Sequence, residues 1–110
     1  MQISKEVLID ISANASISSG VQTNGLLLSG IVFPAAMTGT AITFDFSYDG
    51  TTWHDVHETD NTEVSYTISP GNVVRVDPSG WAFAAAGFLR VVSGSSEAAD
   101  RTINLIFKAS

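Results

Sequence analysis

The sequence predicts an all-β fold, a single antiparallel β-sandwich of about eight strands in jelly-roll order, with an immunoglobulin-like sandwich as the alternative. The clearest sign is the alternation of apolar with small or polar residues over 41–48, which is the period of a strand with one buried face. Asp49-Gly50 follows at once, and this pair favours a tight hairpin turn. Turn residues then recur at intervals of roughly 8 to 14 residues, the spacing of short strands in a sandwich.

Alternation and turn residues predict strands over residues 3–11, 23–33, 41–48, 52–57, 63–68, 73–77, 88–93 and 102–108. Gly25 and Gly30 indicate a bulge or bend in the second strand, and Pro34 ends it because proline cannot donate to a ladder. Asp77 and Pro78 suit the N-cap and the first position of a helix, so one short helical turn is expected between the last strands.

The length fits one domain, which we divide into residues 1–20, a strand plus a flexible arm, and residues 21–110, the sandwich. Segment 12–20, SANASISSG, has the small and polar residues of a loop or flexible edge. No apolar run is long enough for a signal-peptide core or a membrane span, so no membrane association is expected. The chain has no cysteine and hence no disulfide, which is consistent with folding in a reducing cytoplasm.

Charge is scarce and negative. The net charge is −6 with five Lys and Arg in all, which argues against nucleic-acid binding, since that needs clustered positive charge. Charged residues make up 15% of the chain, against about 25% in a typical soluble domain. Because charges are depleted where proteins contact one another, this composition favours a domain that packs against other protein surfaces. A Ser/Thr-rich monomeric sandwich is the alternative.

No residue pattern indicates catalysis or a cofactor. The serines lack a Gly-x-Ser-x-Gly elbow, and neither histidine has a nucleophile near it in sequence, so the chain is predicted not to be an enzyme. His54 and His57 point to opposite faces of a strand and so cannot share one ion without a bulge. A Ca²⁺ site is conceivable from Asp55, Glu58, Asp60 and Glu63. These acids lack the spacing of a defined Ca²⁺-binding loop. We therefore predict that they form a solvated acidic turn and bind no metal.

Two groups of residues are candidates for a protein interface. One is the face of the first strand that carries Ile3, Lys5, Val7 and Ile9. The other is the pair Trp81 and Phe83, whose connection must either cover the core or present them to a partner or a ligand. Arg90, which alternates with apolar neighbours, is expected to pair with an acid such as Asp77 or Asp100.

Two stretches resemble known families. Residues 44–56, FDFSYDGTTWHDV, resemble the hairpin of discoidin-type, galactose-binding-like domains, and Phe88-Leu89-Arg90-Val91 matches a later strand of those domains. Residues 30–105 resemble small phage structural proteins in the motifs GIVFP, SYDGTTW, FLRVVSG and ADRT. Some proteins of that kind decorate or cement capsids.

The phage resemblance implies a non-enzymatic virion protein, made in the host cytoplasm, that binds the outer capsid surface and cements neighbouring shell subunits. Its partner would be the major capsid protein or another virion protein. A clamp of this kind works best as a homo-oligomer, with a trimer favoured, because each copy then binds multivalently. Residues 1–20 are the expected arm, adding to a partner's sheet edge. The alternatives are a glycan-binding module on a tail or fibre, and a small tail or baseplate connector.

Overall fold

The computed structural model describes residues 4–109, which form nine β-strands and one short 3₁₀ helix. In chain order the elements are β1 (Ser4–Ile11), β2 (Val21–Gln22), β3 (Leu26–Val32), β4 (Ala41–Ser47), β5 (His54–Asp55), β6 (Ser65–Thr67), β7 (Val73–Arg75), η1 (Pro78–Ala84), β8 (Phe88–Ser93) and β9 (Arg101–Ala109). Every pairing between these strands is antiparallel. The all-β class predicted from alternation is therefore confirmed.

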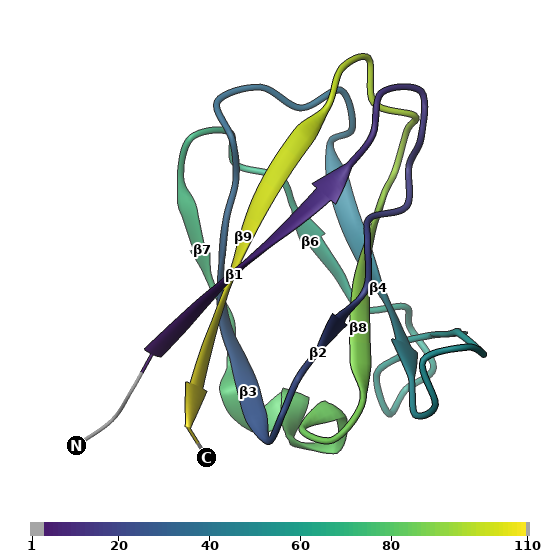
Figure 1. The fold of residues 1–110 in the computed structure, drawn as a ribbon, viewed down its shortest axis with the longest axis vertical. Coiled ribbons are helices and arrows are strands. Elements are labelled where there is room, and N and C mark those ends of the chain that lie inside the picture. Colours follow the sequence, from purple (N-terminus) through teal and green to yellow (C-terminus); the bar gives the residue numbers. More distant parts are fainter. Residues whose placement is uncertain (1–3, 110) are drawn as a thin grey trace.

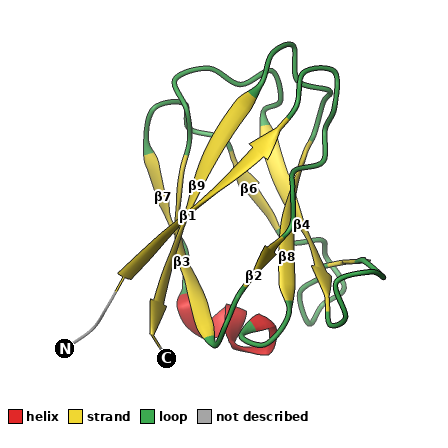
Figure 2. Ribbon diagram, viewed as in Figure 1, coloured by secondary structure: helices red, strands yellow, loops and turns green. Residues whose placement is uncertain are grey.

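The strands form two facing sheets, with η1 across one end of the sandwich (Figures 1 and 2). One sheet has the order β1-β9-β3-β7, and the other has the order β2-β8-β4-β5, with β6 also beside β4. β6 pairs with the first half of β4 and β5 with the second half, so the two short strands together act as one broken strand. Counted that way, the eight strands change sheet at every connection except the one from β4 to the broken strand, which is the jelly-roll order.

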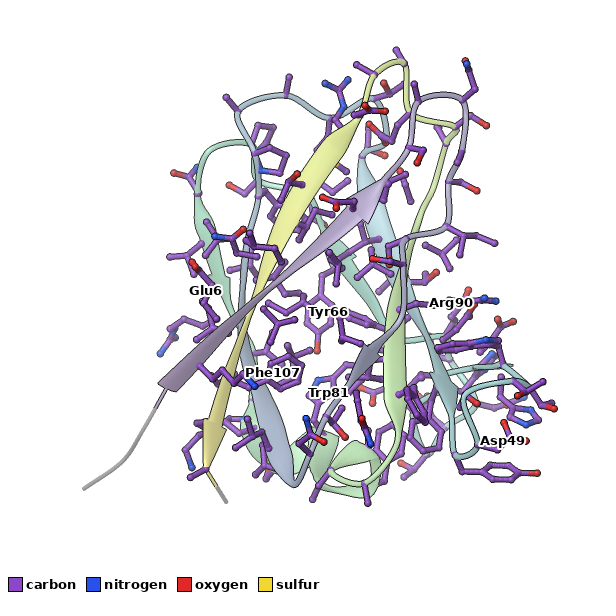
Figure 3. The ribbon with its side chains drawn as sticks, in the orientation of Figure 1. Glu6, Asp49, Tyr66, Trp81, Arg90 and Phe107 are labelled. Carbon is purple, nitrogen blue, oxygen red and sulfur yellow. The ribbon has the colours of Figure 1, made fainter. Side chains whose placement is uncertain are left out.

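The core lies between the sheets and centres on Phe44 of β4. Its ring makes edge contacts with the rings of Tyr66 and Trp81, at centroid distances of 6.0 and 4.8 Å. Figure 3 shows Tyr66, Trp81 and Phe107 lying between the two sheets. The residues with 0 to 1% exposure that fill the remaining core are Ile9, Ile11, Leu28, Ile31, Ile42, Ala84, Leu89, Val91, Ile103, Leu105 and Phe107. Alternate strand residues thus supply the buried face that the sequence pattern predicts.

Local predictions hold where the sequence carries a strong signal. The register of β3 against β9 shifts between Leu28 and Gly30, which confirms the predicted bulge. Asp77 caps η1 by accepting a hydrogen bond from the Ser79 amide, and Pro78 opens the helix as expected. β2 was not predicted, because two residues are too short to show alternation.

The prediction of a tight hairpin turn at Asp49-Gly50 is wrong, because the connection is longer. Six residues, 48–53, separate β4 from β5. The Asp49 carboxylate accepts hydrogen bonds from the amides of Thr51 and Thr52, and the Ser47 hydroxyl accepts one from Gly50. These side-chain acceptors hold a wider turn, in which Gly50 takes the positive φ of 82°.

The structure describes residues 4–20 of the predicted strand and flexible arm, and they lie against the rest of the sandwich. β1 pairs with β9 along its whole length, and Ile9 and Ile11 are fully buried. Residues 12–20 are also tied down: Asn14 donates its amide to the Glu97 carbonyl, and Ser18 donates its amide to the Val91 carbonyl. The strand is therefore part of the sandwich, because its inward side chains complete the core.

Candidate functional site

Apolar side chains lie open on the outer side of the β1-β9-β3-β7 sheet. The register places Leu8, Asn104, Val32 and Val73 in one row across all four strands, so their side chains share a face. Leu8 is 57% exposed and Val73 is 60% exposed. Leu27 and Ile106 lie on the same face in neighbouring rows. We call the surface formed by Leu8, Leu27, Val32, Val73 and Ile106 the outer face.

Polar groups on the β1 side of the outer face are held in place. Asn104 donates a hydrogen bond to the Glu6 carboxylate at 2.7 Å, and Thr102 donates one to the Asp10 carboxylate at 2.8 Å. β1 is the outermost strand of its sheet, so its other edge has no strand partner within residues 4–109. An apolar centre beside ordered polar groups is the composition of a protein-binding surface.

A pocket of about 350 Å³ opens where η1 meets β6 and the segment that follows β5. It is lined by Val56, His57, Glu58, Thr59, Val64, Tyr66, Asp77, Gly80, Trp81 and Phe83. Trp81 and Phe83 stand two residues apart on the short helix, and their rings stack with centroids 5.8 Å apart. We call this cavity the aromatic pocket.

The walls of the aromatic pocket are fixed by the core. The Trp81 indole Nε1–H donates a hydrogen bond to the Tyr66 hydroxyl at 3.1 Å, which satisfies a buried donor. The Phe83 ring packs edge-on against Phe46 at 5.4 Å and remains 55% exposed. Because Trp81 is only 3% exposed, Phe83 is the ring of this pair that a ligand can reach.

Two carboxylates, Glu58 and Asp77, stand in the lining of the aromatic pocket, which contains no Lys or Arg. Burial raises the pKa of the Tyr66 hydroxyl, the hydrogen bond from Trp81 lowers it, and the charges of Glu58 and Asp77 raise it further. One oxygen of Asp77 already accepts from Ser79, through both its amide and its hydroxyl. The pocket thus combines aromatic walls with a negative potential.

Arg90 pairs with Asp45, so the expected pairing with Asp77 or Asp100 is wrong. Its Nε donates to the Asp45 carboxylate at 2.9 Å, and its guanidinium lies 4.3 Å from the centroid of the Trp53 ring. The register places Asp45 opposite Arg90 on β8, which the sequence alone does not reveal. Burial raises the pKa of Asp45, Arg90 lowers it, and the neighbouring Asp55 raises it again.

The structure brings together three potential metal ligands, Asp55, His57 and Glu63, that the sequence did not indicate as a group. Ligand atoms of Asp55, His57 and Glu63 all lie within 4.8 Å of one another, because Asp55 and His57 alternate along one strand face and Glu63 bridges to His57. His57 Nδ1 is 3.0 Å from the Asn61 carbonyl oxygen, which leaves Nε2 as the ring nitrogen open to an ion. All three side chains are exposed. The Ca²⁺ set considered above includes only two of these residues.

Glu97 is a buried acid that sequence reasoning missed. Its carboxylate accepts hydrogen bonds from the amides of Thr38 and Gly39, from the Ser93 hydroxyl and from Arg101 Nε. Burial alone would raise the pKa of Glu97, but these donors outweigh it and lower the pKa to about 2. Four donors from three segments meet here, so Glu97 joins the loops at this end of the sandwich.

The residues predicted to form an interface separate in the structure. Ile3 lies outside the described residues. Lys5 is exposed and Val7 half-buried, whereas Ile9 and Trp81 are core residues whose side chains no partner can reach in the folded domain. Phe83 alone of the second pair is open to solvent. The inward face of β1 was chosen because it is apolar, which is also the reason that it is buried.

The fold is similar to that of the SPBc2 prophage-derived protein YomS, with a TM-score of 0.56 at 13% identity over 97% of this chain and 96% of that one. A chain of the Bacillus endospore appendages, which are disulfide-linked pili, has a TM-score of 0.45 and 12% identity, over 99% of this chain and 88% of that one. A chain of the cyanophage Pam1 capsid asymmetric unit has a TM-score of 0.41 and 10% identity, over 97% of this chain and 82% of that one. At such identities the similarity concerns the fold alone. No protein-family profile and no curated protein matches the sequence. Within residues 4–109, no helix has the length and apolar character to cross a membrane.

Proposed function

We propose that the chain is a non-enzymatic structural protein of a phage particle, which binds the outer capsid surface and joins neighbouring shell subunits. The observation that carries the proposal is the outer face. Leu8 and Val73 stand at its two edge strands and are more than half exposed, with Val32 between them. Exposed apolar side chains aligned across a rigid sheet favour contact with another protein.

Fold and composition support the same proposal. The strands β1, β3 and β9 have seven to nine residues and pair along most of their length, so their sheet offers a wide surface. The low content of charged residues suits burial against a partner. The prophage origin of the fold neighbour is in line with the resemblance of residues 30–105 to phage structural proteins. In this account the partner is the major capsid protein, and a trimer lets each copy bind multivalently.

The glycan-binding alternative cannot use Trp81 as the ring on which a sugar stacks. A sugar-binding site needs an exposed aromatic ring as a platform, and the Trp81 ring is buried against Phe44 and Tyr66. A tail or baseplate connector would use the same outer face, so the location in the particle has to be measured.

The test is a binding assay with shells that lack the chain. The variant Leu8→Glu/Val73→Glu places two charges on the outer face, and Ile17→Glu is the matched control because Ile17 is 46% exposed and bridges to β8 in the other sheet. We expect the control to co-sediment with shells like the wild type and the double variant to lose at least about tenfold in affinity. Unaltered binding by a correctly folded double variant would refute the role of the outer face.

A further inference from the structure

The aromatic pocket is a concave surface that the proposed role of the chain does not use. It shares no residue with the outer face, so either surface can be occupied without the other. Its walls are rigid: the Trp81 indole is hydrogen-bonded to Tyr66, and Phe83 packs on both Trp81 and Phe46. A preformed cavity of this kind binds without a large ordering cost.

The chemistry of the lining selects a cation. Glu58 and Asp77 are both carboxylates, and the one lining residue that can become positive is His57. Glu58 belongs to segment 45–63, which has six acidic residues and no Lys or Arg, although one of the six, Asp45, is paired with Arg90. A cationic ligand can pair with the carboxylates of Glu58 and Asp77, which are exposed to water, whereas an anion would be repelled.

The molecule already holds an arginine in such surroundings. The Arg90 guanidinium lies over the Trp53 ring at 4.3 Å and donates to the Asp45 carboxylate at 2.9 Å. The aromatic pocket offers the same two components, an aromatic ring in Phe83 and carboxylates in Glu58 and Asp77, without an arginine of its own. A planar guanidinium can stack on a ring and donate to a carboxylate at once, which a compact ammonium cannot do as well.

We propose that the aromatic pocket is a receptor for an arginine side chain of another protein, with the guanidinium stacked on Phe83 and hydrogen-bonded to Glu58 and Asp77. An arginine at the tip of a loop is the occupant that fits, since a cavity of about 350 Å³ takes one side chain and not a folded segment.

The test uses N-acetyl-arginine amide as the probe and the indole N–H resonance of Trp81 as the reporter in ¹H–¹⁵N spectra of the full chain. The chain has two tryptophans, so Trp53→Phe assigns the signal. N-acetyl-citrulline amide is the matched control, because it has nearly the shape of arginine without the charge. We expect a saturable shift of the Trp81 signal with the arginine probe and at least about tenfold weaker binding of the citrulline probe.

The variant Glu58→Gln/Asp77→Asn removes both charges while asparagine keeps the N-cap of η1, so the fold should be retained. It should weaken arginine binding about tenfold or more, and Phe83→Ala, a change at an exposed ring, should weaken it independently. Equal binding of the two probes, binding of methyl glucoside in place of arginine, or no shift of the Trp81 signal would each overturn the proposal.

Discussion

The outer face and the segment 45–63 leave opposite kinds of groups in water. The outer face exposes Leu8 and Val73 on a sheet of long strands, whereas segment 45–63 carries six acids and contains only the two-residue strand β5 in full. In the long sheet the inward side chains and the backbone ladder supply the stability, so the outward side chains are free to serve a partner. In segment 45–63 some carboxylates hold turns, as Asp49 and Asp60 do, and others remain open.

The largest predicted effect separates the two faces of β1. Ile9→Ala removes a fully buried side chain from the core and should lower the free energy of unfolding by about 4 kcal/mol. Leu8→Ala, one residue away on the outer face, should change it by less than about 0.5 kcal/mol. Urea denaturation of both variants measures the difference. Equal costs for the two changes would show that the outer face contributes to folding as the core does.

A smaller effect on the free energy of unfolding is expected at Glu97, whose carboxylate accepts four hydrogen bonds. Glu97→Gln removes the charge that pairs with Arg101 and places an amide against the N–H groups of Thr38 and Gly39. Because this leaves buried donors unpaired, we expect a loss of about 3 kcal/mol in the free energy of unfolding. Thermal unfolding at neutral pH measures it, and a loss below about 1 kcal/mol would contradict the assigned role.

The same acid predicts how stability depends on pH. The folded state holds the pKa of Glu97 at about 2, below its ordinary value of 4.5, so at lower pH the unfolded chain binds a proton that the folded chain does not. This contribution is present above pH 4.5 and is lost as the pH falls toward 2. The wild type and Glu97→Gln should therefore converge in stability in that range. A constant difference between them from pH 6 to pH 3 would be evidence against the shift.

The smallest predicted effect lies in segment 45–63. Asp55 stands directly opposite Asp45 in the pairing of β4 with β5, and like charges in that position repel. Asp55→Asn should therefore stabilise the domain by about 0.5 kcal/mol at neutral pH. Molar salt should reduce this gain only in part, because Asp55 is exposed but Asp45 is buried. Destabilisation by Asp55→Asn would mean that this carboxylate has a favourable partner.

The strands could be predicted from the sequence because one buried face leaves a period of two, as in β4 and β9. The pocket could not, since Tyr66, Glu58 and η1 come together only through the pairing of β6 with β4 and the packing of Trp81 on Phe44. The outer face was equally hidden, because Leu8 and Val73 become neighbours through β9 and β3. One local signal was available: Glu97 lies among small residues, four positions before Arg101.

The hydrogen bonds of residues 12–20 could not be read from the sequence for the same reason. A polar stretch after a strand reads as flexible, but Ser18 is held by backbone and side-chain bonds to β8, and Asn14 by a bond to the Glu97 carbonyl. Removing residues 1–20 would delete Ile9 and Ile11 from the core, so loss of binding by that truncation could not be distinguished from unfolding. Substitutions on the outer face are the sharper test.

The most direct test of the central claim is the copy number of the chain in purified particles from its source, measured by quantitative mass spectrometry against the major shell protein. A structural protein that joins shell subunits should be present in a fixed ratio to them, in the hundreds of copies of a repeating lattice. A handful of copies would assign the chain to the tail or a fibre, and its absence from the particle would contradict the account.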